Sequence, residues 1–153
     1  MIFNKLLTDK LINITSNAAI ACHPYIGKND KVKADKAAAD SMRKNLNDLN
    51  INGKVVIGEG ELDEAPMLYI GEKLGNGKGP NIDIAVDPVE GTNFVAKNLP
   101  GAMSVIAVSE KGNLFNSPET YMQKIATGNH IPKNTVDLDY SVEQNIKNYS
   151  EET

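Results

Sequence analysis

The sequence predicts an α/β (α+β) domain, because two amphipathic helices open the chain and short apolar strands follow them. Apolar residues recur at spacings of three and four from Phe3 to Ala21, which indicates a helix with one buried face. The same spacing continues in a second helix that we expect to start near Asp35. Residues 50–53 (NING) favour a turn and end this second helix.

Three strands are expected after these helices. KVVIG (54–58) is a short apolar run with glycine on both sides. NIDIAVD (81–87) alternates apolar and polar residues, which is the period of a strand, and we expect Pro88 to close it. AMSVIAVS (102–109) predicts the third strand.

Helices and turns are expected in the remaining segments. PMLYIGEKLG (66–75) is typical of a short helix with proline in its first turn. EKGN (110–113) predicts a turn, and LFN (114–116) begins a hairpin partner for the strand before it. SPETYMQKIATG (117–128) predicts a last helix that begins with an N-cap serine and ends at a glycine, and a short strand is expected at 135–139.

Length and composition describe an ordinary single-domain protein. A chain of 153 residues can form one domain with a core, which we expect over residues 1–140, followed by a disordered tail over residues 141–153. The net charge of -4 gives no attraction for nucleic acid or an anionic membrane, and no segment has the roughly 20 apolar residues that cross a bilayer. Cys22 is the only cysteine, which excludes an intramolecular disulfide and fits a cytoplasmic location.

Acidic residues gather where the predicted elements begin or end. Asp35 is near a helix start, and the others follow the first two strands: Glu59, Glu61, Asp63 and Glu64, then Asp87 and Glu90. If these strands are parallel neighbours, both acidic groups lie at the edge of the sheet where α/β proteins bind ligands. Converging carboxylates repel one another unless a cation neutralises them, and oxygen ligands select Mg²⁺ or Mn²⁺.

Each of these features also has a purely structural explanation. Asp35 alone fits a helix N-cap, and Asp87 before Pro88 fits a turn. An acidic run after a strand fits a solvated loop. Thr92, which follows Gly91 where a helix begins, could receive a phosphate oxygen or cap the helix. Spacing alone leaves these alternatives open.

Three stretches of the sequence together resemble one enzyme family. VVIGEGELDEAPMLYIGEKLG (55–75), DIAVDPVEGT (83–92) and GNLFNSPETYMQKIATG (112–128) closely resemble the N-terminal half of class II fructose-1,6-bisphosphatases. These enzymes belong to the lithium-sensitive, metal-dependent sugar and inositol phosphatase superfamily. The DP-acid-GT signature is shared across that superfamily, whereas GEGELDEAPMLYIGEK is typical of the class II enzymes. The resemblance implies the N-terminal half of the layered sugar-phosphatase fold, with two helices packed on a mixed β-sheet.

The resemblance also implies a site and a reaction. The implied metal ligands, for Mn²⁺ or Mg²⁺, are Asp35, Glu59, Asp87 and Glu90. The implied substrate-binding residues are Glu90, Gly91, Thr92 and Tyr121, and the implied catalytic residues, which act on the attacking water, are Asp63 and Thr92. The implied reaction is hydrolysis of the 1-phosphate of fructose 1,6-bisphosphate to fructose 6-phosphate and phosphate, a step of gluconeogenesis.

The sequence departs from the family in two residues and in length. Lys36 stands where the family usually has glycine, and Asn93 stands where it usually has arginine. Family chains are roughly twice as long, and the missing half would include a further acidic ligand in a GAPEG-like motif. Half of the fold is expected to expose apolar surface, so we expect a homo-oligomer or association with a missing C-terminal half.

Three functional hypotheses remain open on the sequence alone. The chain is a sugar bisphosphatase that works alone or with a partner chain, or a related phosphatase for sedoheptulose bisphosphate or inositol phosphate. In the third hypothesis it is an inactive or split-gene fragment that needs a partner chain. Neither nucleic acid nor a membrane is expected as a partner.

Overall fold

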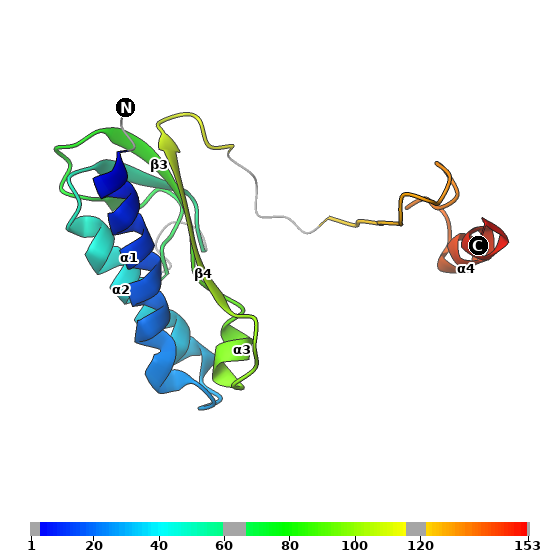
Figure 1. The fold of residues 1–153 in the computed structure, drawn as a ribbon, viewed down its shortest axis with the longest axis horizontal. Coiled ribbons are helices and arrows are strands. Elements are labelled where there is room, and N and C mark those ends of the chain that lie inside the picture. The colour runs from blue at the N-terminus through cyan, green and yellow to red at the C-terminus, as the bar shows by residue number, and fades with distance from the viewer. Residues whose placement is uncertain (1–3, 60–66, 116–121, 153) are drawn as a thin grey trace. The chain divides into compact units, whose positions relative to one another are not determined.

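The computed structural model describes residues 4–59, 67–115 and 122–152. The chain forms two compact units, Met1–Ser117 and Pro118–Thr153. In the first unit, two long helices pack on one face of a four-stranded sheet (Figure 1). This arrangement confirms the predicted α/β (α+β) fold with two helices on a mixed sheet.

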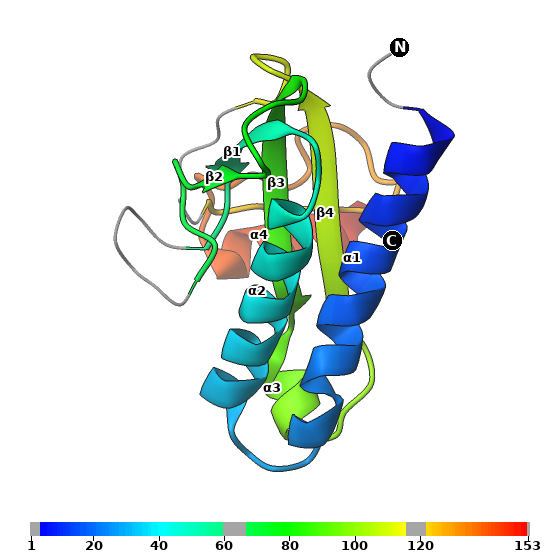
Figure 2. The same cartoon turned by 90° about the vertical axis from the view of Figure 1, so that its left-hand side faces the viewer.

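The two long helices are α1 (Lys5–Cys22) and α2 (Lys31–Asn47), which lie side by side over the sheet (Figure 2). The predicted start of the second helix near Asp35 is wrong, because α2 begins one turn earlier. Asp30 is its N-cap, and its Oδ1 accepts a hydrogen bond from the backbone N–H of Lys33 at 3.0 Å. Within the described residues, no helix is both long enough and apolar enough to cross a membrane.

The sheet has the strand order β2-β1-β3-β4, and its strands are β1 (Asn52–Ile57), β2 (Lys73–Leu74), β3 (Asn81–Glu90) and β4 (Met103–Glu110). β1 and β3 are parallel, whereas β1–β2 and β3–β4 are antiparallel, so the sheet is mixed. The three strands predicted from the sequence are confirmed. The parallel pair brings the ends of β1 and β3 to the same edge.

The core lies between the helices and the inner face of the sheet. Its most deeply buried members come from both layers: Ala18, Ala38, Met42, Leu46, Val55, Ile82 and Ile84. Full burial of one such large aliphatic side chain contributes about 1.5–3 kcal/mol to stability. This packing holds α2 against β3 and so fixes the position of the elements that carry the acidic residues.

β3 continues beyond its predicted end. Pro88 does not close the strand, which runs on to Glu90. The pairing of β3 with β4 shifts register between Asp87 and Glu90, and proline is tolerated at such an irregularity because it has no N–H to donate to the ladder. Asp87 and Glu90 therefore both belong to a strand, and the explanation of Asp87 as a turn residue is wrong.

The helix predicted at 66–75 is wrong for its described part, 67–75. This segment pairs with β1 instead, because the N–H of Gly71 donates to the carbonyl of Val55 at 2.8 Å. The N–H of Val55 in turn donates to the carbonyl of Glu72 at 2.9 Å, and β2 follows. Backbone pairing with a distant strand outweighs the local helix signal of a proline and apolar residues.

The turn predicted at 110–113 is confirmed, and the N–H of Gly112 donates to the buried Asp83 carboxylate at 2.6 Å. The predicted hairpin partner is wrong for its described residues, because neither Leu114 nor Phe115 is in a strand; Asn116 lies outside the described residues. Phe115 is 79% exposed and therefore has no packing that would hold it against β4.

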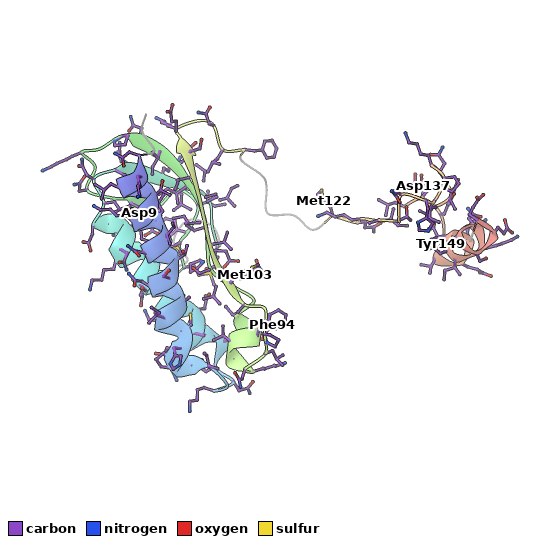
Figure 3. All side chains as sticks on the ribbon, viewed as in Figure 1. Asp9, Phe94, Met103, Met122, Asp137 and Tyr149 are labelled. Atoms are coloured by element: carbon purple, nitrogen blue, oxygen red, sulfur yellow. The ribbon has the colours of Figure 1, made fainter. Side chains whose placement is uncertain are left out.

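The sheet face opposite the two helices is uncovered within the first unit. Met103 is 60% exposed and Val105 is 43% exposed, and Met103 points away from α1 (Figure 3). β4 is also the last strand of the sheet, so its outer edge has no strand partner within the described residues. The apolar surface expected for half of a larger fold is therefore present.

The second unit contains one helix, α4 (Val142–Glu152), in its described part. The sequence predicts a disordered tail over 141–153, whereas the structure forms this helix and divides the chain after Ser117 rather than after residue 140. The Asn145 side chain holds the helix to the preceding turn. It donates to the Asp137 carbonyl at 2.8 Å and accepts from the Asp137 N–H at 2.9 Å.

Two predictions of secondary structure in the second unit are wrong in the described residues. Residues 122–128 are not helical, whereas 117–121 lie outside the description. Met122 and Ile125 are 68% and 45% exposed, so no apolar face is buried to stabilise a helix there. The strand predicted at 135–139 is absent, because these described residues form bends followed by one turn.

We predict that Gly75→Ala lowers the free energy of unfolding by about 2–4 kcal/mol. Gly75 has φ 93°, and a Cβ there would lie 2.3 Å from the backbone oxygen of Ile51. Gly77→Ala is the matched control, because Gly77 has φ 74° but no atom within 4 Å of the added Cβ. Urea unfolding followed by circular dichroism measures both variants, and equal losses would contradict the prediction.

Candidate functional site

A cavity of about 400 Å³ lies where the ends of β1 and β3 meet α2. Three of the four predicted metal ligands line it: Asp35 from α2, Glu59 just after β1, and Asp87 from β3. Two predicted phosphate-binding residues, Gly91 and Thr92, also line the cavity. The other lining residues are Lys31, Val32, Met67 and Val89.

Asp35 lies in the second turn of α2 with its carboxylate partly buried. Its Oδ1 is buried and accepts no hydrogen bond within the described part of the chain. Burial raises the pKa of Asp35 above its ordinary value. The explanation of Asp35 as a helix cap is wrong, because Asp30 occupies that position.

Asp87 and Glu90 form a pair of carboxyl groups that share a hydrogen bond. Burial raises the pKa of Asp87 to about 6, and the hydrogen bond and negative charge of Glu90, together with the charge of Asp35, act in the same direction. The Oδ1 of Asp87 is buried and has no hydrogen-bond partner among the described residues. Glu90 is exposed and contacts Asp87, but it does not line the cavity.

Glu59 is held at the end of β1 by its own backbone. Its N–H donates to the carbonyl of Leu68 at 2.9 Å, which joins the two segments on either side of residues 60–66. Gly58 permits this close approach, because a Cβ there would lie 2.2 Å from the Leu68 oxygen. The glycine beside the acidic run therefore has a packing role.

Thr92 begins the short helix α3 (Thr92–Ala96), as the sequence predicts for a helix start at this point. The N-cap position is Gly91, so the explanation of Thr92 as a capping residue is wrong. Thr92 lines the cavity together with Asp87. Its hydroxyl is thus near the carboxylates, where a phosphate oxygen could accept a hydrogen bond.

The acidic residues fit a hard divalent cation in chemical type. The donors are all carboxylate oxygens, and the unpaired buried oxygens of Asp35 and Asp87 mark a place that a cation would stabilise. Within residues 4–59, 67–115 and 122–152, no group of three or more His, Cys, Asp or Glu side chains is arranged to hold an ion. The carboxylates therefore line the cavity without forming a complete coordination shell.

Two predicted site residues, Asp63 and Tyr121, lie outside the described residues, as do Glu61 and Glu64. The two departures from the family pattern point away from the site. Lys36 donates to Asp40 at 2.7 Å on the exposed side of α2, and the side chain of Asn93 is exposed. Neither residue lines the cavity.

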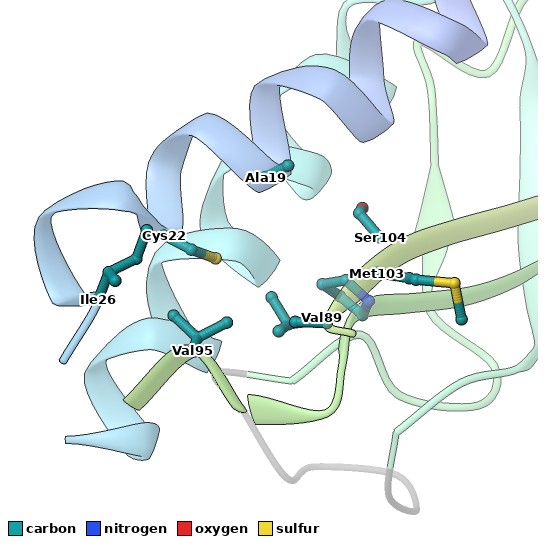
Figure 4. Close-up of a pocket in the computed structure, with 9 residues that line it drawn as sticks. Ala19, Cys22, Ile26, Val89, Val95, Met103 and Ser104 are labelled. Atoms are coloured by element: carbon teal, nitrogen blue, oxygen red, sulfur yellow. The ribbon is translucent and has the colours of Figure 1, made fainter. Parts of the chain in front are cut away.

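A second cavity, of about 150 Å³, lies between α1 and the start of β4 (Figure 4). Sequence reasoning did not predict it, because its apolar wall comes from several elements. Ser104 points into it from β4, and Cys22 lies on the side of α1. Burial and the charge of Asp35 raise the pKa of Cys22 to about 11, so its thiol stays protonated and is a poor nucleophile.

Comparison with known proteins identifies the family. The family described as bacterial fructose-1,6-bisphosphatase, glpX-encoded, matches residues 5–153. The chain belongs to this family. Membership confirms the resemblance to class II fructose-1,6-bisphosphatases, which the sequence motifs suggest.

Two curated members of the fructose-1,6-bisphosphatase family show how much of it the chain represents. The D-fructose 1,6-bisphosphatase class 2/sedoheptulose 1,7-bisphosphatase of Synechococcus sp. (strain CC9902) is 50% identical over 145 residues, which are 95% of this chain and 43% of that protein. The fructose-1,6-bisphosphatase 1 class 2 of Escherichia coli (strain K12) is 49% identical over 135 residues, which are 88% and 40%. The chain thus spans less than half the length of these relatives.

A solved structure, an extragenic suppressor from Pyrococcus furiosus, aligns with a TM-score of 0.46 and 21% identity over 70% of this chain and 41% of that chain. This likeness is too weak to bear on the fold or the function. The assignment to the bisphosphatase family comes from the sequence comparisons alone.

We predict that the metal-free chain loses stability relative to Asp87→Asn as pH rises. The folded pKa of Asp87 is about 6 and its ordinary value is 3.8, so its protonated form stabilises the folded state. That contribution is fully present below the unfolded pKa and is lost as pH rises through the folded pKa. The measurement is the urea midpoint of the wild type and of Asp87→Asn, in EDTA, at about pH 5 and about pH 7.5. If the two midpoints change equally with pH, the prediction is contradicted.

Proposed function

We propose that the chain is the metal- and phosphate-binding half of a class II fructose-1,6-bisphosphatase. The observation that carries this proposal is the cavity in which α2, β1 and β3 bring together Asp35, Glu59 and Asp87 beside Thr92. The reaction would be hydrolysis of the 1-phosphate of fructose 1,6-bisphosphate to fructose 6-phosphate and phosphate. We further propose a cytoplasmic location and a role in gluconeogenesis.

The proposed metal ligands are Asp35, Glu59, Asp87 and Glu90, and the proposed metal is Mg²⁺ or Mn²⁺. The oxygen-only donor set and the raised pKa values of Asp35 and Asp87 support this choice. Divalent ions at such a site supply charge neutralisation and Lewis acidity toward phosphoryl and water oxygens. Glu90 is exposed and does not line the cavity, so it would act from the outer side.

The chain's own residues have proposed roles in the chemistry. Glu90, Gly91 and Thr92 would bind the phosphate, and Tyr121 would contact the sugar. Asp63 would accept a proton from the attacking water while Thr92 orients it, if each lies within hydrogen-bond reach. The water oxygen would bond to phosphorus as the bond from phosphorus to the sugar oxygen breaks, and that oxygen would take a proton to become the 1-hydroxyl.

The length of the chain makes a partner part of the proposal. The chain spans 43% of the Synechococcus relative, and its sheet has an exposed face and an unpaired edge within the described residues. We propose that this face packs on the C-terminal half of the enzyme. In the isolated protein, a second copy would cover it instead, giving a homo-oligomer.

Three alternatives to this proposal keep the family assignment. Sedoheptulose bisphosphate is the better supported second substrate, because the Synechococcus relative is named for both sugar bisphosphates. Inositol phosphate is a weaker candidate that rests on the superfamily signature at residues 87–92. The chain could also be an inactive or split-gene fragment that requires a partner chain.

We predict metal-dependent phosphate release from fructose 1,6-bisphosphate when the purified chain is mixed with the C-terminal half of the Synechococcus relative. The chain alone is expected to release at least about 100-fold less, because single positioning groups in active sites are worth such factors. Phosphate is measured with Mn²⁺, with Mg²⁺ and with EDTA, and sedoheptulose bisphosphate and inositol phosphate are assayed in parallel.

Asp87→Asn is the control for this assay, because it preserves shape and removes one proposed ligand. It is expected to abolish release in the mixture. Release that is equal for Asp87→Asn and the wild type would refute the proposed site, and no release from any mixture would favour the inactive fragment.

We predict that the isolated chain self-associates through its exposed sheet face. Val105→Lys is expected to yield a monomer at concentrations where the wild type forms a larger species, because a charge on an edge strand opposes pairing. Ile12→Lys is the matched control, since Ile12 is 58% exposed on α1, away from that face. Sedimentation velocity measures both, and a monomeric wild type or an equal effect of the control would contradict the prediction.

A further inference from the structure

Arg43 joins α2 to residues 67–72, which follow β1 and Glu59 in the sequence. Its Nε donates to Oε1 of Glu72 at 2.6 Å, and its Nη2 donates to Oε2 of Glu72 at 3.2 Å. The same Nη2 donates to the backbone carbonyl of Met67 at 2.6 Å. A weaker contact of 3.5 Å joins Nη1 to Oδ1 of Asp40 on the same helix. The guanidinium therefore contacts two points of residues 67–72 at once.

This ion pair is largely removed from solvent. The side chain of Arg43 is 23% exposed and that of Glu72 is 10% exposed. Removing one partner of such a pair leaves a buried charge uncompensated, so the contact resists opening. Arg43 is also the only arginine in the 153 residues. Only arginine has the planar fork that can hold a carboxylate and a carbonyl together.

The contacts of Arg43 lie next to the candidate metal site. Met67, whose carbonyl Arg43 holds, lines the cavity beside Glu59. Leu68, the next residue, accepts the backbone hydrogen bond of Glu59 at 2.9 Å. Asp35 lies eight residues before Arg43 on α2, about 12 Å along the helix axis. Arg43 thus connects the helix that carries Asp35 to the backbone that holds Glu59.

We propose that Arg43 is a positioning residue that keeps Glu59 beside Asp35 and so sets the affinity of the cavity for a divalent cation. This inference rests on the proposed function, and it adds a residue that none of the predicted ligands includes. Its physical basis is repulsion, because the two carboxylates favour separation when no cation is bound. The contacts of Arg43 to Glu72 and to the Met67 carbonyl oppose that separation, but Arg43 touches no metal itself.

The test measures Mn²⁺ binding to the intact chain by isothermal titration calorimetry. Arg43→Met is expected to weaken binding about ten-fold, the effect typical of residues that orient metal ligands. Arg43→Lys is the second variant, which keeps a positive charge beside Glu72 and so protects the fold. Its single ammonium cannot reproduce the forked contact to Glu72 and Met67, so it is also expected to weaken binding.

Two controls separate positioning from general stability. Asp40→Asn weakens only the 3.5 Å contact of Arg43, together with the exposed ion pair of Lys36, and is expected to bind Mn²⁺ like the wild type. Leu46→Ala creates a cavity in the core on the same helix, and is expected to lower the melting temperature without a comparable loss of Mn²⁺ affinity. Wild-type affinity in both Arg43 variants, or an equal loss in Leu46→Ala, would overturn the inference.

The wild type and Asp87→Asn distinguish this inference from the proposed function. If the wild type binds no Mn²⁺, or if Asp87→Asn binds as tightly as the wild type, the proposed metal site fails and the role of Arg43 fails with it. If the wild type binds and Asp87→Asn does not, the metal site stands. The Arg43 variants then decide the inference alone.

Discussion

The parallel pairing of β1 with β3 is the constraint on which the candidate site depends. Because the two strands run in the same direction, the residues that follow β1 and those at the end of β3 reach the same edge of the sheet. An antiparallel pair would separate Glu59 from Asp87 by about the length of a six-residue strand, roughly 20 Å. Core packing holds α2 against the strands and so places Asp35 near the same edge. The parallel pairing and this packing together bring three carboxylates to one cavity.

This arrangement concentrates negative charge where water is partly excluded. Two unit charges about 5 Å apart interact by about 3 kcal/mol at an effective dielectric constant of 20, which is comparable to burying a large aliphatic side chain. Burial raises the pKa of both Asp35 and Asp87, and for Asp87 the hydrogen bond and charge of Glu90 and the charge of Asp35 add to that rise. Arg43 cannot neutralise these carboxylates, because its guanidinium is already bound to Glu72. Lys31 is the one cationic side chain among the described residues that line the cavity, so protons or a cation from solution balance the remaining negative charge.

Sequence reasoning succeeded where side-chain periodicity decides structure and failed where distant backbone pairing does. The stripes of α1 and α2 and the alternation in β3 are local, and each element is found. Residues 67–75 carry a helix signal, but their hydrogen bonds go to β1, which no local pattern reports. The two aspartates at 30 and 35 both fit a helix start, and only the bond to Lys33 identifies the cap. At the site, the resemblance to the family implies that Asp35, Glu59 and Asp87 lie together, and all three line the cavity. Glu90 does not line it, because the pairing of β3 with β4 shifts register between Asp87 and Glu90, and the family motif does not encode this shift.

Holding the acidic residues in place and enclosing a substrate are separate tasks in this fold. The contacts that hold them, from the core packing of α2 to the pairing of Arg43 with Glu72, are complete within the first unit. The enclosure of a substrate is not complete within the first unit. The described carboxylates form no complete coordination shell for an ion, and one face of the sheet has no cover in that unit. Cation binding requires carboxylate oxygens held close together, whereas in-line displacement at phosphorus also requires aligned attacking and leaving groups in a dry site. The described residues are therefore expected to bind a cation with less structural support than the proposed phosphate chemistry requires, because that chemistry also needs the uncovered sheet face to be enclosed.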